Sequence, residues 1–286
     1  MRQCLNQVFI GGLLDEIDLE ERNKDGRDYI SGKVTFLVRQ TITGVPEENY
    51  IPVSCFAYKM TSKGTENPFY KNLYELYKNG ISIKARGSEL EADYYEMTNG
   101  AIRVNSFTDK KTNQLVNTVQ ISNGFFNKKS RGPDYAKFVL EPFILDMIDE
   151  VVDDVPTGRL ILDTAIVQYK DRVDRIKLVV EKPNAIDYVR NNYQVDDTVN
   201  VNGMIRIAAV TQESESPVEM GFGEDIAKVR QKIVREFVIT SGSVGPLDEP
   251  KAYNREDIER AIAVAKAEAK TNLEEKIKPV RVSRGF

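Results

Sequence analysis

The sequence predicts a mostly β protein with two halves of similar order and a C-terminal helix. Alternating apolar runs typical of strands dominate the chain. A unit of short helix followed by an apolar strand occurs at residues 72–90 and again at 185–207. A chain of 286 residues can form two domains that each bury a core. We therefore expect domains at 1–130 and 134–245, and a separate amphipathic helix at 254–278.

Strand signals and one helix make up the first half. Asn67 is a helix N-cap, Pro68 suits the first helical position, and Gly80 ends the helix. Asn99 and Gly100 predict a hairpin between the last two strands. The elements expected in order are strands at 6–19, 29–41 and 49–58, the helix at 68–78, and strands at 81–95 and 101–108.

The second half repeats this order after a polar linker at 127–134, which includes a basic stretch. Its expected elements are strands at 138–152, 159–169 and 173–180, a helix at 185–192, a strand at 198–209 and a last strand near 236–240. Three strands, a helix and two strands form the order of the OB fold, a five-stranded Greek-key barrel. The predicted fold class is therefore two tandem OB-fold barrels followed by a C-terminal helix.

The C-terminal helix has one apolar stripe. Asn254 is its predicted N-cap and Pro279 its end, and the stripe consists of Ile258, Ile262, Ala265, Ala269, Leu273 and Ile277. Because an exposed stripe of this length would promote association, we expect it to lie on the second half or on another copy of itself.

Composition excludes several classes of protein. The chain has no histidine, which excludes Ser-His-Asp and Cys-His catalysis and every histidine-containing metal site. Its two cysteines fit a reducing cytosol, and the chain has no run of about 18 apolar residues, so we expect no membrane span. The N-terminus meets acidic residues directly after a short apolar stretch and lacks a small-residue cleavage pattern, so we expect no signal peptide. The first 132 residues hold 18 Lys+Arg against 16 Asp+Glu, whereas the rest holds 22 against 28. Basic character is thus confined to the first half.

Aromatic and basic side chains on the predicted strands of the first half indicate single-strand binding. Tyr50, Phe56 and Tyr58 share the face opposite an apolar core set, while Lys33, Arg39, Lys84 and Arg86 are predicted on neighbouring strands. Binding without sequence preference needs flat rings for the bases and cations for the phosphates. The alternative for Phe56 is packing under a loop or against the second half.

Several short motifs of the first half resemble the bacterial and phage single-stranded DNA-binding (SSB) proteins. The matching residues are Asn6, Val8, Ile10, Gly12 and Leu14; Gly32, Val34, Phe36 and Val38; Tyr50 and Phe56; and Asn79, Gly80, Ile83, Gly87 and Leu90. The resemblance covers residues 5–108 and implies an OB fold whose bases stack on Tyr and Phe, since the chain lacks Trp. It also adds Tyr94 and Tyr95 to the expected site. The chain departs from the family by lacking the acidic C-terminal tip.

The second half carries a weaker signal. Its third strand offers Arg172, Arg175 and Lys177 but only Tyr169 as a nearby ring. This half is expected to serve structure, partner contact or phosphate contact.

The leading hypothesis is a non-catalytic protein that binds single-stranded DNA in the cytoplasm of a bacterium or phage-infected host, with no cofactor and no metal. The sequence leaves open RNA as a ligand, replication or recombination proteins as partners, and homo-oligomerisation. One alternative is a tandem-OB scaffold that binds proteins of a phage or mobile element. The other is a metal-dependent nuclease using the acidic cluster Asp149, Glu150, Asp153 and Asp154.

Overall fold

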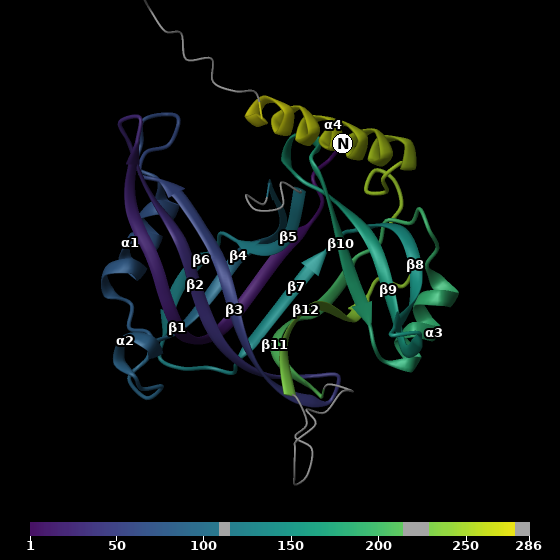
Figure 1. Ribbon diagram of the computed structural model, residues 1–286, viewed down its shortest axis with the longest axis horizontal. Helices are drawn as coiled ribbons and strands as arrows, with labels where there is room; N and C mark the ends of the chain where they lie inside the picture. Colours follow the sequence, from purple (N-terminus) through teal and green to yellow (C-terminus); the bar gives the residue numbers. More distant parts are fainter. Residues whose placement is uncertain (109–114, 214–228, 278–286) are drawn as a thin grey trace, which may run out of the picture.

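The chain is mostly β, as predicted. The computed structural model describes residues 1–108, 115–213 and 229–277, and its strands form one mixed sheet of twelve among these residues. The hydrogen-bonded order is β6-β4-β5-β3-β2-β1-β7-β11-β12-β10-β9-β8, with β4 also paired to β1. In Figure 1 the first half of the chain lies on the left and the second half on the right.

The first half forms a closed ring of pairings. Its elements are β1 (Asn6–Lys24), β2 (Arg27–Ile42), β3 (Val45–Tyr58), α1 (Pro68–Asn79), α2 (Ile83–Arg86), β4 (Tyr94–Thr108), β5 (Leu115–Ser122) and β6 (Phe125–Lys129). The pairings run β1-β2-β3-β5-β4 and return to β1, and only the β3–β5 pair is parallel in this ring. Gly12 of β1 permits the close approach of β2, because a Cβ atom there would lie 2.5 Å from the Leu37 carbonyl oxygen.

The second half has the same order of pairings. Its elements are β7 (Tyr135–Leu140), β8 (Phe143–Val152), β9 (Val155–Val167), η1 (Tyr169–Asp171), β10 (Val173–Val180), α3 (Pro183–Asn192), β11 (Val201–Glu213) and β12 (Val229–Gly242). The pairings run β8-β9-β10-β12-β11-β7, again with the third and last strands parallel. The strand predicted at 138–152 is interrupted at Glu141 and Pro142, which separate β7 from β8.

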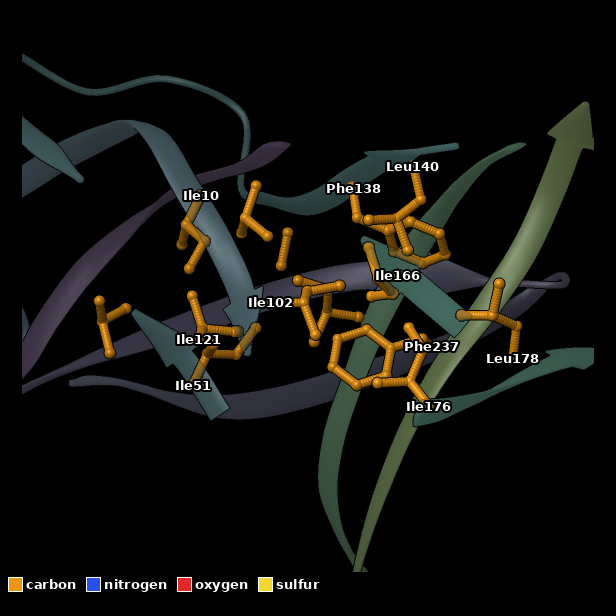
Figure 2. Packing of buried hydrophobic residues seen from close by; sticks show 14 of the residues in the cluster. Ile10, Ile51, Ile102, Ile121, Phe138, Leu140, Ile166, Ile176, Leu178 and Phe237 are labelled. Atoms are coloured by element: carbon orange, nitrogen blue, oxygen red, sulfur yellow. The ribbon is translucent and has the colours of Figure 1, made fainter. Parts of the chain in front are cut away.

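The two halves share one sheet and one core. Strand β7 pairs with β1 on one side and β11 on the other, so it joins the halves directly. Figure 2 shows Ile102 between Ile10 and Ile121 of the first half and Ile166 and Phe237 of the second, all within one buried cluster. The halves are therefore packed against each other over their cores.

The predicted linker at 127–134 is not wholly free. Its first three residues belong to β6, which pairs with β4. Lys128 forms an ion pair with Asp93 at 2.7 Å, and Lys129 lies 3.6 Å from Glu96. These contacts fix the basic stretch of the linker onto the first half.

Two local predictions in the first half are wrong. The strand expected at 81–95 is replaced by the four-residue helix α2 and by the turns and loop at 87–93. The helix forms because the Ser82 side chain accepts a hydrogen bond from the Ala85 amide, and Gly87 ends it at φ +72°. Strand β4 begins only at Tyr94. Asn99 and Gly100 lie inside β4 rather than in a hairpin, with Gly100 opposite Val8. The last strand of the ring is therefore Leu115–Ser122 and not 101–108.

Helix α1 and the C-terminal helix start where the sequence predicts. The Asn67 side chain accepts a hydrogen bond from the Phe69 amide at 3.0 Å, and Asn254 accepts one from the Glu256 amide at 2.8 Å. Helix α4 (Arg255–Ile277) buries Ile258 in the shared core and lies beside β10 (Figure 1). The side chains of the later stripe residues and Pro279 lie outside the described residues. None of the described helices is long and apolar enough to cross a membrane.

Candidate nucleic-acid interface

Strand β3 presents its aromatic side chains outward. Along the strand Ile51, Val53 and Cys55 are buried, whereas the alternate residues Tyr50 and Phe56 are 45% and 44% exposed. This alternation follows from the two-residue period of a strand with one face on the core. Both rings have the exposed position that the sequence predicted, and their role remains a prediction.

Phe56 belongs to a cluster of exposed and half-buried aromatic rings. Its ring centroid lies 5.3 Å from that of Tyr29 and 5.0 Å from that of Tyr58. The Arg27 guanidinium lies 4.3 Å from the centroid of Tyr58, within the range of a cation–π contact. We call these four residues the aromatic cluster. The sequence analysis did not include Tyr29 in the site. The β2–β3 pairing, which places Tyr29 directly opposite Tyr58, identifies it.

Tyr50 lies apart from this cluster. It is six residues from Phe56 on the same face, about 20 Å along the strand. Its hydroxyl donates a hydrogen bond to Glu48 at 2.9 Å, which raises the pKa of Tyr50 above its ordinary value. Tyr50 is thus separate from the aromatic cluster and lies near the middle of β3.

A polar row crosses the outer face between these rings. Lys33 on β2 lies opposite Ser54 on β3, whose hydroxyl donates to Gln120 on β5 at 3.2 Å. Gln120 lies opposite Arg103 on β4, so Lys33 and Arg103 are three strand spacings apart, about 14 Å. No carboxylate among the described side chains forms an ion pair with Lys33 or Arg103. Arg103 is a candidate that the sequence analysis missed.

This row borders a groove between the two halves. The groove has a volume of about 830 Å³ and is lined by strands of both halves, including Lys33 and Ser54 from the first and Lys177 and Arg235 from the second. Lys177 and Arg235 are exposed and have no ion-pair partner among the described side chains. Arg175 also lines the groove but is paired with Asp163 at 2.5 Å.

The remaining acidic residue of the groove, Glu236, is occupied by a buried ion network. Arg159 contacts Glu236 at 2.9 Å and Arg206 contacts it at 2.7 Å. The members of the network are Glu47, Glu150, Arg159, Glu181, Arg206 and Glu236. Two arginines bind the Glu236 carboxylate, but they are shared among four carboxylates, so the network keeps a net charge of −2.

The same network ties the two halves together. Glu47 of β3 accepts from Arg206 of β11 at 3.0 Å, and the Thr43 hydroxyl donates to Glu181 at 2.9 Å. Burial opposes the charged form of Glu181, but the hydrogen bonds from Arg206 and Thr43 outweigh it and lower the pKa of that carboxyl. The hydrogen bond from Arg159 lowers the pKa of Glu150.

Three of the predicted basic residues lie elsewhere. Arg39 is bound to Glu89 at 2.7 Å and to Glu48 at 2.9 Å, and these hydrogen bonds raise its pKa. Lys84 contacts Glu16 at 2.7 Å, which raises the pKa of the lysine. Lys84 and Arg86 lie on α2 and not on a strand, and none of the three residues lines the groove. The charges of Arg39 and Lys84 are compensated by neighbouring carboxylates.

Tyr94 and Tyr95 do not belong to the exposed site. They are 3% and 6% exposed, and the Tyr94 hydroxyl donates to the Pro133 carbonyl at 2.6 Å. Burial raises the pKa of both tyrosines. A base cannot stack on a ring that the protein itself covers on both faces, so we remove the two tyrosines from the candidate interface.

The four acidic residues of the nuclease hypothesis have separate partners or lie in a turn. Asp149 forms an ion pair with Arg190, and Glu150 forms one with Arg159. Asp153 and Asp154 form the β8–β9 turn with positive φ angles. Within the described ranges no three acidic or cysteine side chains are close enough together to hold a metal ion.

Comparison with solved structures shows an SSB-like fold. The single-stranded DNA binding protein from Thermus aquaticus matches with a TM-score of 0.53 and 12% identity, covering 89% of this chain and 99% of that one. A deletion variant of the same protein matches with a TM-score of 0.52 and 13% identity, covering 90% and 100%. The likeness therefore extends over both halves, beyond the 5–108 region in which the sequence shows the resemblance.

The family model named YorF matches residues 5–276, and the chain belongs to this family. No curated protein matches the chain.

Proposed function

We propose that this protein binds single-stranded DNA along the outer face of β3 and through the groove between its halves. The observation that carries the proposal is the row of uncompensated cations beside exposed rings. Lys33 and Arg103 flank β3 and β5, and Lys177 and Arg235 face them from the second half. Stacking platforms next to a basic groove are the combination that binds single strands without reading sequence.

The charges beside the groove favour one path for the phosphate backbone of the DNA. On the β1 side of β2, Asp18 lies opposite Lys33 and Glu20 lies opposite Ser31, and both carboxylates are on exposed residues. On the other side, Arg103 faces Gln120 with no acidic neighbour in the pairing. Phosphates are therefore expected over β3 and β5, away from β1, with bases directed toward the aromatic cluster.

The proposal includes the assignment of each half as an OB barrel. It is supported by the two rings of pairings, each with one parallel pair between its third and last strands and a helix after the third strand. A fold shared with an SSB protein over both halves also supports it.

We further propose that the protein acts by binding alone, without catalysis, in the cytoplasm of a bacterium or of a phage-infected host. Coating or protecting single strands during replication or recombination is the role we assign to it. The sequence resemblance to bacterial and phage SSB proteins supports this setting.

A titration of the full chain with oligo(dT), oligo(rU) and a duplex of equal length tests the proposal. The expected order is oligo(dT) bound more tightly than the duplex at every salt concentration, with log affinity falling linearly against log salt. The position of oligo(rU) decides between DNA and RNA. Absence of binding to all three, or preference for the duplex, would refute the proposal.

A second candidate function, a protein-binding scaffold, is favoured by a different surface. The end of the β8–β9 hairpin exposes Val151, Val152 and Val155, which are 54%, 46% and 64% exposed. Exposed apolar side chains grouped in this way mark protein contacts more often than nucleic-acid contacts. A chain that binds no nucleic acid, and whose Val152→Asp variant loses a protein partner, would support the scaffold.

A further inference from the structure

The turn between β9 and β10 presents an aromatic ring to solvent. Tyr169 begins this turn and is 70% exposed, more than Tyr50 or Phe56. The Lys170 ammonium lies 5.7 Å from the centroid of the Tyr169 ring. An exposed ring accompanied by a cation is the pairing that a nucleotide needs, with the base on the ring and the phosphate near the cation.

The turn has a defined backbone. Lys170 and Asp171 adopt left-handed conformations at φ 59° and 57°, which cost roughly 1–2 kcal/mol per residue outside glycine. The Gln168 amide donates to the Arg172 carbonyl at 2.7 Å and closes the turn. The surrounding structure thus holds the backbone that carries Tyr169 in a defined turn.

A hollow separates this turn from α4. Its volume is about 720 Å³, and Tyr169, Lys170 and Arg172 line one side of it. The other side consists of small and apolar side chains of α4, Ala261, Val264 and Ala265, together with Arg260 and Asp257. A flat apolar group thus meets a ring on one side and aliphatic side chains on the other.

The hollow adjoins the groove between the halves. The Arg172 guanidinium donates to the carbonyl of Val104, and it also contacts Asp174 at 3.0 Å. Val104 lines the groove, whereas Arg172 lines the hollow, so the hydrogen bond links the two walls. Arg172 remains about half exposed, with its side chain 53% accessible. A strand that leaves the groove past Val104 therefore reaches Tyr169 next.

The geometry points to a further nucleotide-binding site in this hollow, where a base stacks on Tyr169 and its phosphate lies beside Lys170. Lys170 forms no ion pair among the described side chains, whereas Arg172 is paired with Asp174 and Arg260 with Asp257. The ligand is one nucleotide unit of a single strand that continues from the groove. This inference rests on the proposed function and adds to it a stacking residue supplied by the second half.

The test uses the full chain with oligo(dT) of increasing length and with free dTMP. The variants are Tyr169→Ala, Tyr169→Phe and a control, Tyr188→Ala, which removes another exposed tyrosine on α3. Wild-type affinity is expected to rise with oligonucleotide length to a plateau. Tyr169→Ala should match the wild type on short oligonucleotides and lose about 5- to 150-fold on long ones, the range of one stacked base. Tyr169→Phe and Tyr188→Ala should follow the wild type.

Three results would overturn the inference. Equal affinities of Tyr169→Ala and the wild type at every length would leave the proposed function intact and remove only this site. Tight binding of free dTMP that Tyr169→Ala abolishes, with unchanged binding of long oligonucleotides, would assign the hollow to a free nucleotide instead of the strand. A wild type that binds no oligonucleotide would refute the proposed function itself, and this inference with it.

Discussion

The third strands of the two halves have the same place in the pairing order but different outer faces. Strand β3 exposes Tyr50 and Phe56, whereas β10 exposes Arg175 and Lys177. The buried faces of both strands are mostly apolar, with one buried polar residue each, Asn49 on β3 and Asp174 on β10. The fold therefore fixes the inner faces alike and leaves the outer faces free to diverge. In the proposal, the first half stacks bases and the second half mainly binds phosphates, with Tyr169 as the stacking ring of the second half.

The largest expected effect tests whether the two halves depend on each other. Arg206→Met leaves Glu47, Glu181 and Glu236 without their shared partner, and breaking a mostly buried pair in this way costs about 3–5 kcal/mol of unfolding free energy. Chemical denaturation measures the loss. The control is Arg22→Met, whose ion pair with Glu20 is exposed to solvent and screened, so the loss should be much smaller. Equal small losses in both variants would mean that the network does not hold the halves together.

Acidification should remove part of the same stabilisation. The pKa values of Glu150 and Glu181 are lower in the folded protein than in the unfolded chain. Their contribution is therefore present above the unfolded value of about 4.3 and is lost as the pH falls through the folded pKa. Denaturation midpoints between pH 7 and pH 3 should fall more steeply for the wild type than for Arg206→Met. Parallel curves would show that the network does not cause the acid sensitivity.

The next effect concerns stacking in the first half. Phe56→Ala should weaken oligo(dT) binding by about 1–3 kcal/mol, because it removes one base platform. The control is Phe125→Ala, since Phe125 is also exposed but packs on Phe69 away from the groove. A fluorescence titration compares the two at one salt concentration. If Phe125→Ala weakened binding as much as Phe56→Ala, the path of the DNA strand would not follow β3.

A smaller effect separates charge from stacking in the second half. Lys177→Gln should lower the slope of log affinity against log salt by about 0.7, the loss of one phosphate contact on a single strand. Phe56→Ala should keep the wild-type slope. Lys84→Gln is the control, because Glu16 already compensates that lysine. An unchanged slope for Lys177→Gln would restrict phosphate binding to the first half.

The smallest effect should have the opposite sign. Asp18→Asn removes a negative charge next to Lys33, on the β1 side of the proposed DNA path. A unit charge about 10 Å from a phosphate contributes roughly 0.4 kcal/mol in water, so binding should tighten about twofold at low salt and less at high salt. Weaker binding by this variant would place the DNA backbone elsewhere.

Sequence patterns predicted some local features correctly and others wrongly. Alternation along 49–58 identified both faces of β3, and the cap at Asn67 located α1. The region after Gly80 was mispredicted because Ile81 and Ile83 imitate a strand, while Ser82 and Gly87 in fact cap the short helix α2. The tyrosine pair at 94 and 95 resembles a binding motif, but only the packing of β4 against its neighbours shows that both rings are buried.

The groove itself had no signal in the sequence. Lys33, Lys177 and Arg235 are far apart in the chain, and only the joining of the halves through β7 brings them to one groove. Arg103 lies opposite Gln120, which lines the same groove. Whether a cation can bind a phosphate also depends on the carboxylates beside it. The sequence predicts Arg39 and Lys33 as basic residues of the same strand. In the structure Glu48 and Glu89 compensate the charge of Arg39, whereas no described carboxylate pairs with Lys33.

Photocrosslinking of the full chain to an iodouracil-substituted single strand, with the sites mapped by mass spectrometry, tests the central claim most directly. The account predicts crosslinks at the rings of the aromatic cluster, chiefly Phe56 and Tyr29, and none at Tyr94 or Phe125. It also predicts that the same crosslinked strand protects the groove residues Lys33 and Lys177 from chemical modification. Crosslinks confined to other surfaces, with Lys33 and Lys177 still modified, would contradict a track that runs over β3 and through the groove.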